Sequence, residues 1–185
     1  ADKPTWLVDI DDRGEGSQAW ATDVGWLHDV LRVVEVATGT VAMTAYTALL
    51  FVLLLRRYHR AAFFAAGVML ATSITTSLIK GLVGRDRPPW QSTEALLHNG
   101  AFPSGHASSI TAFAGIVIVL VGMLVRRRNL RRLTYAGALV VVVVVGLDRV
   151  LLGRHYPSDV VGGALLGAGF VLLAIAVYTP QPRSH

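Results

Sequence analysis

Five long apolar stretches constrain this chain more than any other feature of its sequence. A hydrocarbon core of about 30 Å requires roughly 20 consecutive apolar residues in a helix. Buried helices of a soluble domain rarely repeat such a pattern five times in 185 residues, so we expect an all-α, polytopic transmembrane helix bundle. The five stretches cover residues 36–55, 61–79, 104–125, 133–147 and 160–178, and the fourth reaches full length only with Asp148, Arg149 and the residues to 152.

Composition and charge placement agree with a membrane protein. The chain is 53% hydrophobic and 16% charged, which argues against a disordered chain. Its net charge of +5 could suit a nucleic-acid binder, but the arginines cluster between apolar stretches and eight of the twelve acids lie in the first 35 residues. We therefore expect membrane lipids as partners, no nucleic acid and no obligate protein partner. With zero cysteines, a thiol nucleophile, a zinc-thiolate site and a disulfide framework are excluded.

The arginine clusters predict an orientation in the membrane. Three arginines lie within residues 56–60 and five within residues 126–132. Under the positive-inside rule both loops are cytoplasmic, which places residues 85–103, residues 153–157 and the N-terminal segment outside. We expect a multi-pass protein of the cell membrane, with its active site on the extracytoplasmic side. Five spans with an outer N-terminus also predict an export signal or a further upstream helix.

The expected domain organisation has three parts. Residues 1–35 form an extracytoplasmic or interfacial segment, residues 36–178 the transmembrane domain, and residues 179–185 a cytoplasmic tail. Trp6, Trp20 and Trp26 in the first part suit headgroup depth. They indicate either an interfacial lid that helps a lipid enter or, our preferred interpretation, an aromatic anchor.

Polar and ionisable residues occur at the expected outer ends of the spans, where they are costly and therefore functional candidates. Each cation alone could be an interfacial charge, Ser104 alone a helix cap, and either histidine alone a structural residue. Together they would build one anion site with a nucleophile and an acid. The candidates form three groups: Lys80 with Arg87; Ser104, Gly105 and His106; and Arg149, His155 and Asp159.

Residue spacing supports a single site. A helix that continued past Lys80 would carry Arg87 two turns further on, nearly on the same face. A helix beginning at Ser104 would direct free backbone N–H groups at an anion. Asp159, four residues after His155, could accept a proton from one ring nitrogen and expose the other. We interpret Arg85 and Arg154 as headgroup contacts or interfacial charges.

These three groups resemble the signature motifs of the type 2 phosphatidic acid phosphatase superfamily. The matching segments are Lys80 to Pro88, Pro103 to His106, and Arg149 to Asp159. Two features depart from the family pattern. Asp148 stands where the third motif usually has serine, and the family usually has six spans. An acid at position 148 could orient Arg149 by pairing with it, or weaken phosphate binding by repulsion.

The resemblance implies a mechanism that needs no metal and no cofactor. His155, oriented by Asp159, would attack phosphorus and form a phosphohistidine. His106 would protonate the leaving group and then activate water. Charge on the phosphate oxygens would be neutralised by the phosphate-binding set, which comprises Lys80, Arg87, Arg149, the Ser104 hydroxyl and the Gly105 N–H.

The function expected from this resemblance is hydrolysis of a lipid phosphate at the outer leaflet. Polyprenyl pyrophosphate, phosphatidylglycerol phosphate and phosphatidic acid are the candidate substrates. Two alternatives stay open. The same phosphohistidine could transfer phosphate to a lipid or sugar acceptor, or the chain could be a non-catalytic membrane protein that binds lipid or conducts anions.

Overall fold

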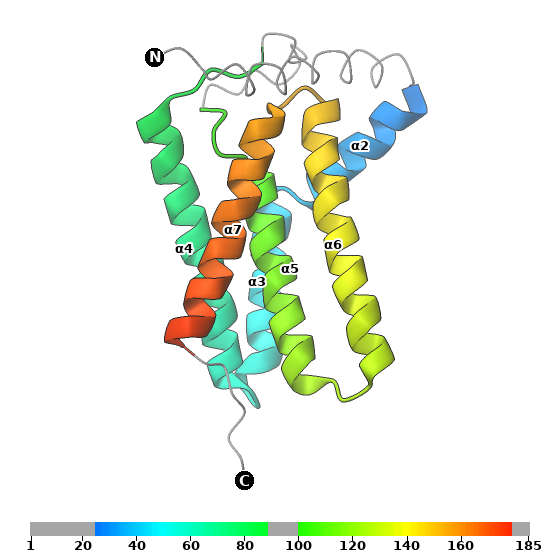
Figure 1. Ribbon diagram of the computed structural model, residues 1–185, viewed down its shortest axis with the longest axis vertical. Helices are drawn as coiled ribbons and strands as arrows, with labels where there is room; N and C mark the ends of the chain where they lie inside the picture. The colour runs from blue at the N-terminus through cyan, green and yellow to red at the C-terminus, as the bar shows by residue number, and fades with distance from the viewer. Residues whose placement is uncertain (1–24, 89–99, 179–185) are drawn as a thin grey trace.

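The computed structural model describes residues 25–88 and 100–178, and over these residues it is entirely helical. Six helices form a bundle whose long axes run side by side, with α2 tilted away from the others at one end (Figure 1). The predicted tail 179–185 and residues 1–24 of the predicted interfacial segment, with Trp6 and Trp20, lie outside the described residues. The helices are α2 (Gly25–Ala37), α3 (Thr40–Leu55), α4 (His59–Val83), α5 (Gly105–Leu124), α6 (Arg128–Leu151) and α7 (Pro157–Val177).

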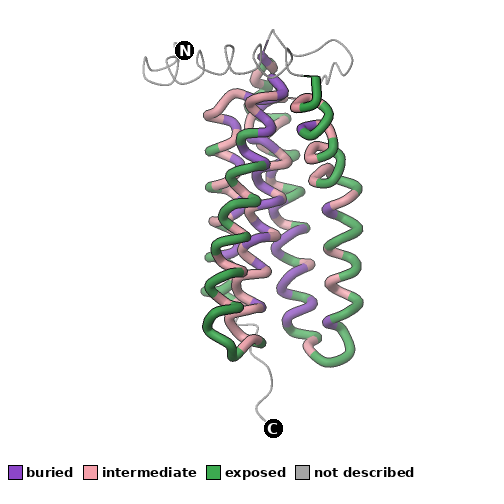
Figure 2. The backbone as a smooth tube through the Cα atoms, turned by 90° about the vertical axis from the view of Figure 1, so that its right-hand side faces the viewer, coloured by how far each residue is buried: buried purple, intermediate pink, exposed green. Residues whose placement is uncertain are grey.

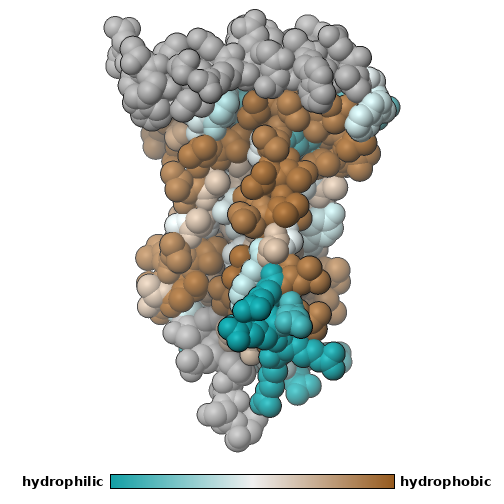
Figure 3. Space-filling model, turned by 45° about the vertical axis from the view of Figure 1, so that its right-hand side comes forward, coloured by the Kyte–Doolittle hydropathy of each residue, from teal (hydrophilic) through white to brown (hydrophobic). Residues whose placement is uncertain are grey.

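The helix lengths agree with a bundle of four or five membrane spans. Helices α4 to α7 are each long and apolar enough to cross a membrane, and α2 with α3 qualifies as one further span bent by 47°. Helix α3 begins at Thr40, later than the predicted start at residue 36, because the chain breaks at Thr38 and Gly39. Apolar side chains cover much of the outer surface along the bundle (Figure 3), as expected for helices that face lipid.

Helix α5 forms the centre of the bundle and contacts α3, α4, α6 and α7. Its buried side chains are mostly small or aliphatic, including Ala112, Ile116 and Leu120. Buried positions lie along the inward faces of the helices, while their outward faces are exposed (Figure 2). A central helix packed on four sides fixes the position of its own N-terminus, where Ser104, Gly105 and His106 lie.

Two glycines of α7 allow it to approach the backbone of α5. A Cβ atom at Gly163 would lie 2.5 Å from the carbonyl oxygen of Ser104, and one at Gly167 would lie 2.4 Å from that of Ser108. Both distances are too short for any side chain, so glycine is required at these positions. The Ser104 N–H also donates to the carbonyl of Asp159 at 2.9 Å. The starts of α5 and α7 are thereby held together.

All three predicted groups lie at one end of the bundle. The C-terminal ends of α4 and α6 and the N-terminal ends of α5 and α7 meet there, whereas the two arginine-rich connections lie at the opposite end (Figure 1). The structure thus brings the three groups to one end of the bundle, as predicted, while the side of the membrane on which that end lies stays a prediction.

Candidate active site

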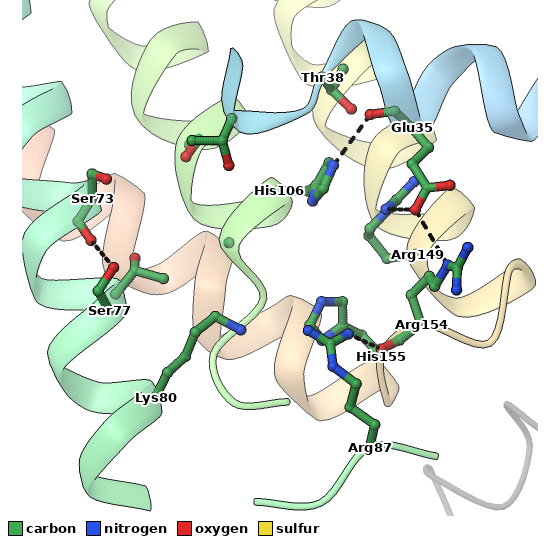
Figure 4. Close-up of a pocket in the computed structure, with 14 residues that line it drawn as sticks. Glu35, Thr38, Ser73, Ser77, Lys80, Arg87, His106, Arg149, Arg154 and His155 are labelled. Atoms are coloured by element: carbon green, nitrogen blue, oxygen red, sulfur yellow. Dashed lines mark hydrogen bonds and ion pairs between the residues drawn. The ribbon is translucent and has the colours of Figure 1, made fainter. Parts of the chain in front are cut away.

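A polar cavity of about 340 Å³ lies where these helix ends meet. Six of the eight predicted site residues line it, and those labelled in Figure 4 lie around one space. The other two, Ser104 and Asp159, are fully buried beside it. The lining residues among the eight are Lys80, Arg87, Gly105, His106, Arg149 and His155.

Lys80 and Arg87 reach the cavity by a different route from the one predicted. Helix α4 does not continue to Arg87, because Gly84 adopts φ of 57° and ends the helix in a left-handed conformation. The expectation of one helical face is therefore wrong, although both side chains line the same cavity. The Arg87 guanidinium donates to the carbonyl oxygen of Arg154 at 2.9 Å, and the Lys80 ammonium to that of Gly100 at 2.7 Å.

The start of α5 matches the prediction in position. Ser104 is the N-cap residue, and its hydroxyl accepts from the Ala107 N–H at 3.4 Å. A Cβ at Gly105 would lie 4.0 Å from Lys80 Cε and the Thr76 methyl group, so this glycine leaves space towards the lysine. The cavity therefore has the first turn of a helix on one side and cations on the other, which suits an anion.

His155 and Asp159 lie close together, as their four-residue spacing predicts, but the predicted hydrogen bond is not formed. His155 Nδ1 is 3.6 Å from Asp159 Oδ2, which is longer than a hydrogen bond. Asp159 is itself fixed, because Oδ2 accepts from the Tyr156 N–H at 3.0 Å and Oδ1 from Arg85 at 2.8 Å. The carboxylate thus faces Nδ1 and leaves Nε2 as the ring nitrogen available for chemistry.

Burial lowers the pKa of His155 to about 4, against the opposing effect of Asp159. At neutral pH the imidazole is therefore uncharged and has a lone pair on one nitrogen. This is the form that a nucleophile requires.

Asp148 pairs with Arg149. Both side chains are buried, and Asp148 Oδ2 accepts from Arg149 Nε at 2.8 Å and also from Nη2. Of the two roles left open for this acid, the contact favours orientation of the arginine, since two N–H groups of the guanidinium donate to one oxygen of a buried carboxylate and such charge-assisted hydrogen bonds are strong.

Three site residues were missed or misjudged at the sequence level. Glu35 was not considered, yet its carboxylate lines the cavity 3.1 Å from Arg149 and 3.3 Å from Arg154. Arg85 and Arg154 were interpreted as headgroup contacts or interfacial charges. Arg154 is instead 2% exposed and lines the cavity. Arg85 pairs with Asp159 and stacks on Tyr156, with 4.1 Å from its guanidinium carbon to the ring centroid.

His106 lies across the cavity from His155, on the first turn of α5 (Figure 4). Its Nε2 is 3.2 Å from the backbone carbonyl oxygen of Glu35. Since a carbonyl can only accept, this contact favours the tautomer with a proton on Nε2. The cavity therefore combines an uncharged histidine, a second histidine on the opposite side, and four cations around one space. Such a set can bind a phosphate group and transfer it.

Comparison with known proteins agrees with this geometry. The family model of the PAP2 superfamily matches residues 61–183, and the chain belongs to that superfamily. Its long apolar helices make it a multi-pass membrane member.

Individual relatives are phosphatases by name. The chain is 37% identical over 106 residues to the decaprenylphosphoryl-5-phosphoribose phosphatase of Mycobacterium tuberculosis, covering 56% of this chain and 52% of the relative. It is 29% identical over 120 residues to the lipid A 1-phosphatase of Rhizobium johnstonii, covering 58% and 43%. The phosphatidylglycerophosphatase B of Bacillus subtilis is 33% identical over 97 residues, covering 51% and 46%. The matches thus span about half the length of these relatives.

A solved structure shares the fold along almost the whole chain. The transmembrane PAP2-type phosphatidylglycerolphosphate phosphatase of Bacillus subtilis superposes with a TM-score of 0.81 at 20% identity, covering 94% of this chain and 86% of that one. At this identity the likeness is one of fold.

Proposed function

We propose that this chain is a membrane lipid phosphatase that forms a phosphohistidine at His155. The observation that carries the proposal is the convergence of Lys80, Arg87, Arg149 and the first turn of α5 around His155 in one cavity. Cations and helix N–H groups placed around a buried nucleophile stabilise charge on phosphate oxygens without rearrangement during the reaction.

The proposed reaction has two steps. His155 Nε2 attacks phosphorus, forming a P–N bond while the P–O bond to the lipid breaks. His106, protonated as an imidazolium, gives a proton to the departing oxygen and becomes neutral. His106 then takes a proton from water, the water oxygen attacks phosphorus, and the P–N bond breaks to release inorganic phosphate. Asp159 orients His155 throughout, and those members of the phosphate-binding set that line the cavity neutralise the equatorial oxygens.

An apolar groove beside the cavity supports a lipid substrate. It has a volume of about 470 Å³, lies between α3 and α4, and is lined by side chains such as Met43, Phe51 and Met69. Thr40, Ser73 and Ser109 line both this groove and the polar cavity. A lipid could therefore place its phosphate among the cations while its tail leaves sideways along the groove.

The candidate substrates are polyprenyl pyrophosphate, phosphatidylglycerol phosphate and phosphatidic acid. The proposal includes the expected domain boundaries and a site on the outer side of the cell membrane. It also includes catalysis without a metal or cofactor. The second candidate is transfer of the phosphoryl group to an acceptor other than water, which the same P–N intermediate would serve.

The test is phosphate release by the purified protein in detergent, with excess EDTA, from the three lipids and from soluble phosphate esters. We expect release from at least one lipid in EDTA, and background release from His155→Ala. The matched control is His59→Ala, which removes an exposed histidine at the opposite end of the bundle and should leave the rate unchanged.

Three results would contradict the proposal. Activity that disappears in EDTA and returns with Mg²⁺ would overturn the metal-free mechanism. Full activity of folded His155→Ala would remove this residue as nucleophile. Label that passes from the lipid to an added alcohol or sugar, with none in inorganic phosphate, would establish the transferase instead.

A further inference from the structure

Glu35 is an acid inside a site built for anions. It lies on α2, near the end of the helix, and its side chain is 18% exposed. One carboxylate oxygen, Oε1, contacts both Arg149 and Arg154, while Oε2 accepts from Arg32 at 3.3 Å. Three arginines therefore surround this carboxylate, and two of them line the cavity.

The contacts of Arg149 explain what Glu35 contributes. Asp148, its neighbour on α6, holds Nε and Nη2, whereas Glu35 comes from α2 and holds Nη1 at 3.1 Å. All three guanidinium nitrogens are thus fixed by two carboxylates. A guanidinium has five N–H groups, so these three bonds leave two N–H groups of Arg149 for phosphate oxygens.

Glu35 also contacts the opposite side of the cavity through its backbone. Its carbonyl oxygen lies 3.2 Å from His106 Nε2 on α5. A single residue of α2 therefore touches a phosphate-binding arginine with its side chain and the proposed general acid with its main chain (Figure 4).

Apolar packing of the described residues also holds α2 against the bundle, where Val34 contacts the main core. Leu31 of α2 and Leu152, just after α6, form a small apolar cluster, with Leu27 and Leu151 packed against it. The chain then breaks at Thr38 and Gly39 before α3, with a bend of 47°. The ionic contacts of Glu35 add to this packing and lie at the end of α2 beside the cavity.

We propose that Glu35 is a positioning residue, which holds Arg149 in the geometry that binds phosphate. The inference rests on the proposed function of the same cavity. A carboxylate beside Arg149 could alternatively act as a competitor that occupies the arginine until phosphate displaces it. The two roles predict opposite changes in phosphate affinity when Glu35 is replaced. Loss of a competitor strengthens phosphate binding, whereas loss of a positioning group weakens it, as do changes to groups that orient the ligands of metal sites.

The experiment compares wild type, Glu35→Gln and Asp29→Asn. Glutamine keeps the backbone carbonyl that contacts His106 and removes the charge that fixes Arg149. Asp29→Asn is the matched control, because Asp29 is an exposed acid on the same helix. Two quantities are measured: KM and kcat for the lipid substrate, and the affinity for inorganic phosphate from the phosphate-dependent rise in melting temperature.

We expect Glu35→Gln to weaken phosphate affinity and raise KM, each by about tenfold to a hundredfold, with a smaller change in kcat because the His106 contact remains. Asp29→Asn should match wild type. In an Arg149→Lys background, Glu35→Gln should change phosphate affinity less than it does in wild type, since part of its effect acts through Arg149.

Tighter phosphate binding by Glu35→Gln would overturn the inference and show that Glu35 is a competitor. Unchanged phosphate affinity of Glu35→Gln, or an equal loss of affinity in Asp29→Asn, would also overturn the inference. If the glutamine variant does not fold, Glu35→Asp is used in its place. Aspartate keeps the charge but withdraws the carboxylate from Arg149 by one methylene, so the same loss of phosphate affinity is expected. The phosphate-binding measurement does not depend on turnover. A wild type that binds phosphate but hydrolyses no lipid would therefore contradict the proposed function and still test the role of Glu35.

Discussion

At the scale of single residues, the buried acid at position 148 departs most from the family pattern. Its contact with Arg149 joins two buried, oppositely charged side chains that are adjacent in the sequence. Removing one partner of a buried pair leaves an uncompensated charge, which costs more than the pair contributes. We therefore interpret Asp148 as part of the machinery that orients Arg149, and not as a repulsive group.

The substitution Asp148→Ser tests this interpretation. Although it restores the usual family residue, we expect weaker phosphate binding and a loss of about 3 kcal/mol in the free energy of unfolding, because Arg149 loses its buried carboxylate partner. Inhibition by inorganic phosphate and thermal unfolding in detergent measure the two effects. Asp86→Ser removes an exposed acid at the same end and serves as the control. Stronger phosphate binding by Asp148→Ser would support repulsion.

Much of the site could be predicted from local spacing, because the helix period relates residues that are close in sequence. His155 and Asp159 are four apart at the start of α7, and Ser104 caps α5 as its position suggested. Glu35 could not be found in this way. It reaches Arg149 across 114 positions of sequence, and no motif surrounds it. The only available signal was an acid next to an apolar run, where a charge is costly.

At the scale of elements, α7 places the proposed nucleophile by packing on α5 without side chains in between. Gly163 and Gly167 face the carbonyl oxygens of Ser104 and Ser108, so the distance between the two helices is set by backbone contact. The apolar runs predicted these helices well. They could not predict where the chain breaks before α3. Nor could they predict where α4 ends, because Gly84 ends it in a left-handed conformation that hydrophobicity does not reveal.

Replacing Gly163 tests the role of close packing. Gly163→Ala places a methyl group 2.5 Å from the Ser104 carbonyl, so α7 must move away from α5. We expect a loss of about 1–3 kcal/mol in stability and a marked loss of activity, since His155 moves relative to the α5 N-terminus. Gly169→Ala lies on the same helix with no atom within 4 Å and should behave as wild type. Equal behaviour of the two variants would contradict this account.

At the scale of the whole molecule, the bundle has two chemically different ends. One holds the cavity, and the other carries the arginines of residues 56–60 and 126–132 (Figure 1). The positive-inside rule places the arginine end in the cytoplasm, so we propose that the cavity faces the outer side.

The lack of native cysteines makes this orientation easy to measure. Single cysteines at exposed positions can be labelled on intact cells with a maleimide that does not cross membranes. We expect labelling of Asp86→Cys near the cavity, and labelling of Asn129→Cys, at the other end, only after permeabilisation. The reverse pattern would place the site in the cytoplasm.

The central claim is that His155 carries the phosphoryl group during turnover, and trapping that intermediate tests it most directly. His106→Ala slows the second step, and p-nitrophenyl phosphate has a leaving group that needs little protonation in the first. The His106→Ala variant is mixed with p-nitrophenyl phosphate and quenched in alkaline denaturant, which preserves the P–N bond. The peptide that contains residue 155 is then examined by mass spectrometry. We predict one phosphoryl group on His155 of the His106→Ala variant, and none on the double variant that also carries His155→Ala. Turnover with His155 unmodified, or with the group on another residue, would contradict the account.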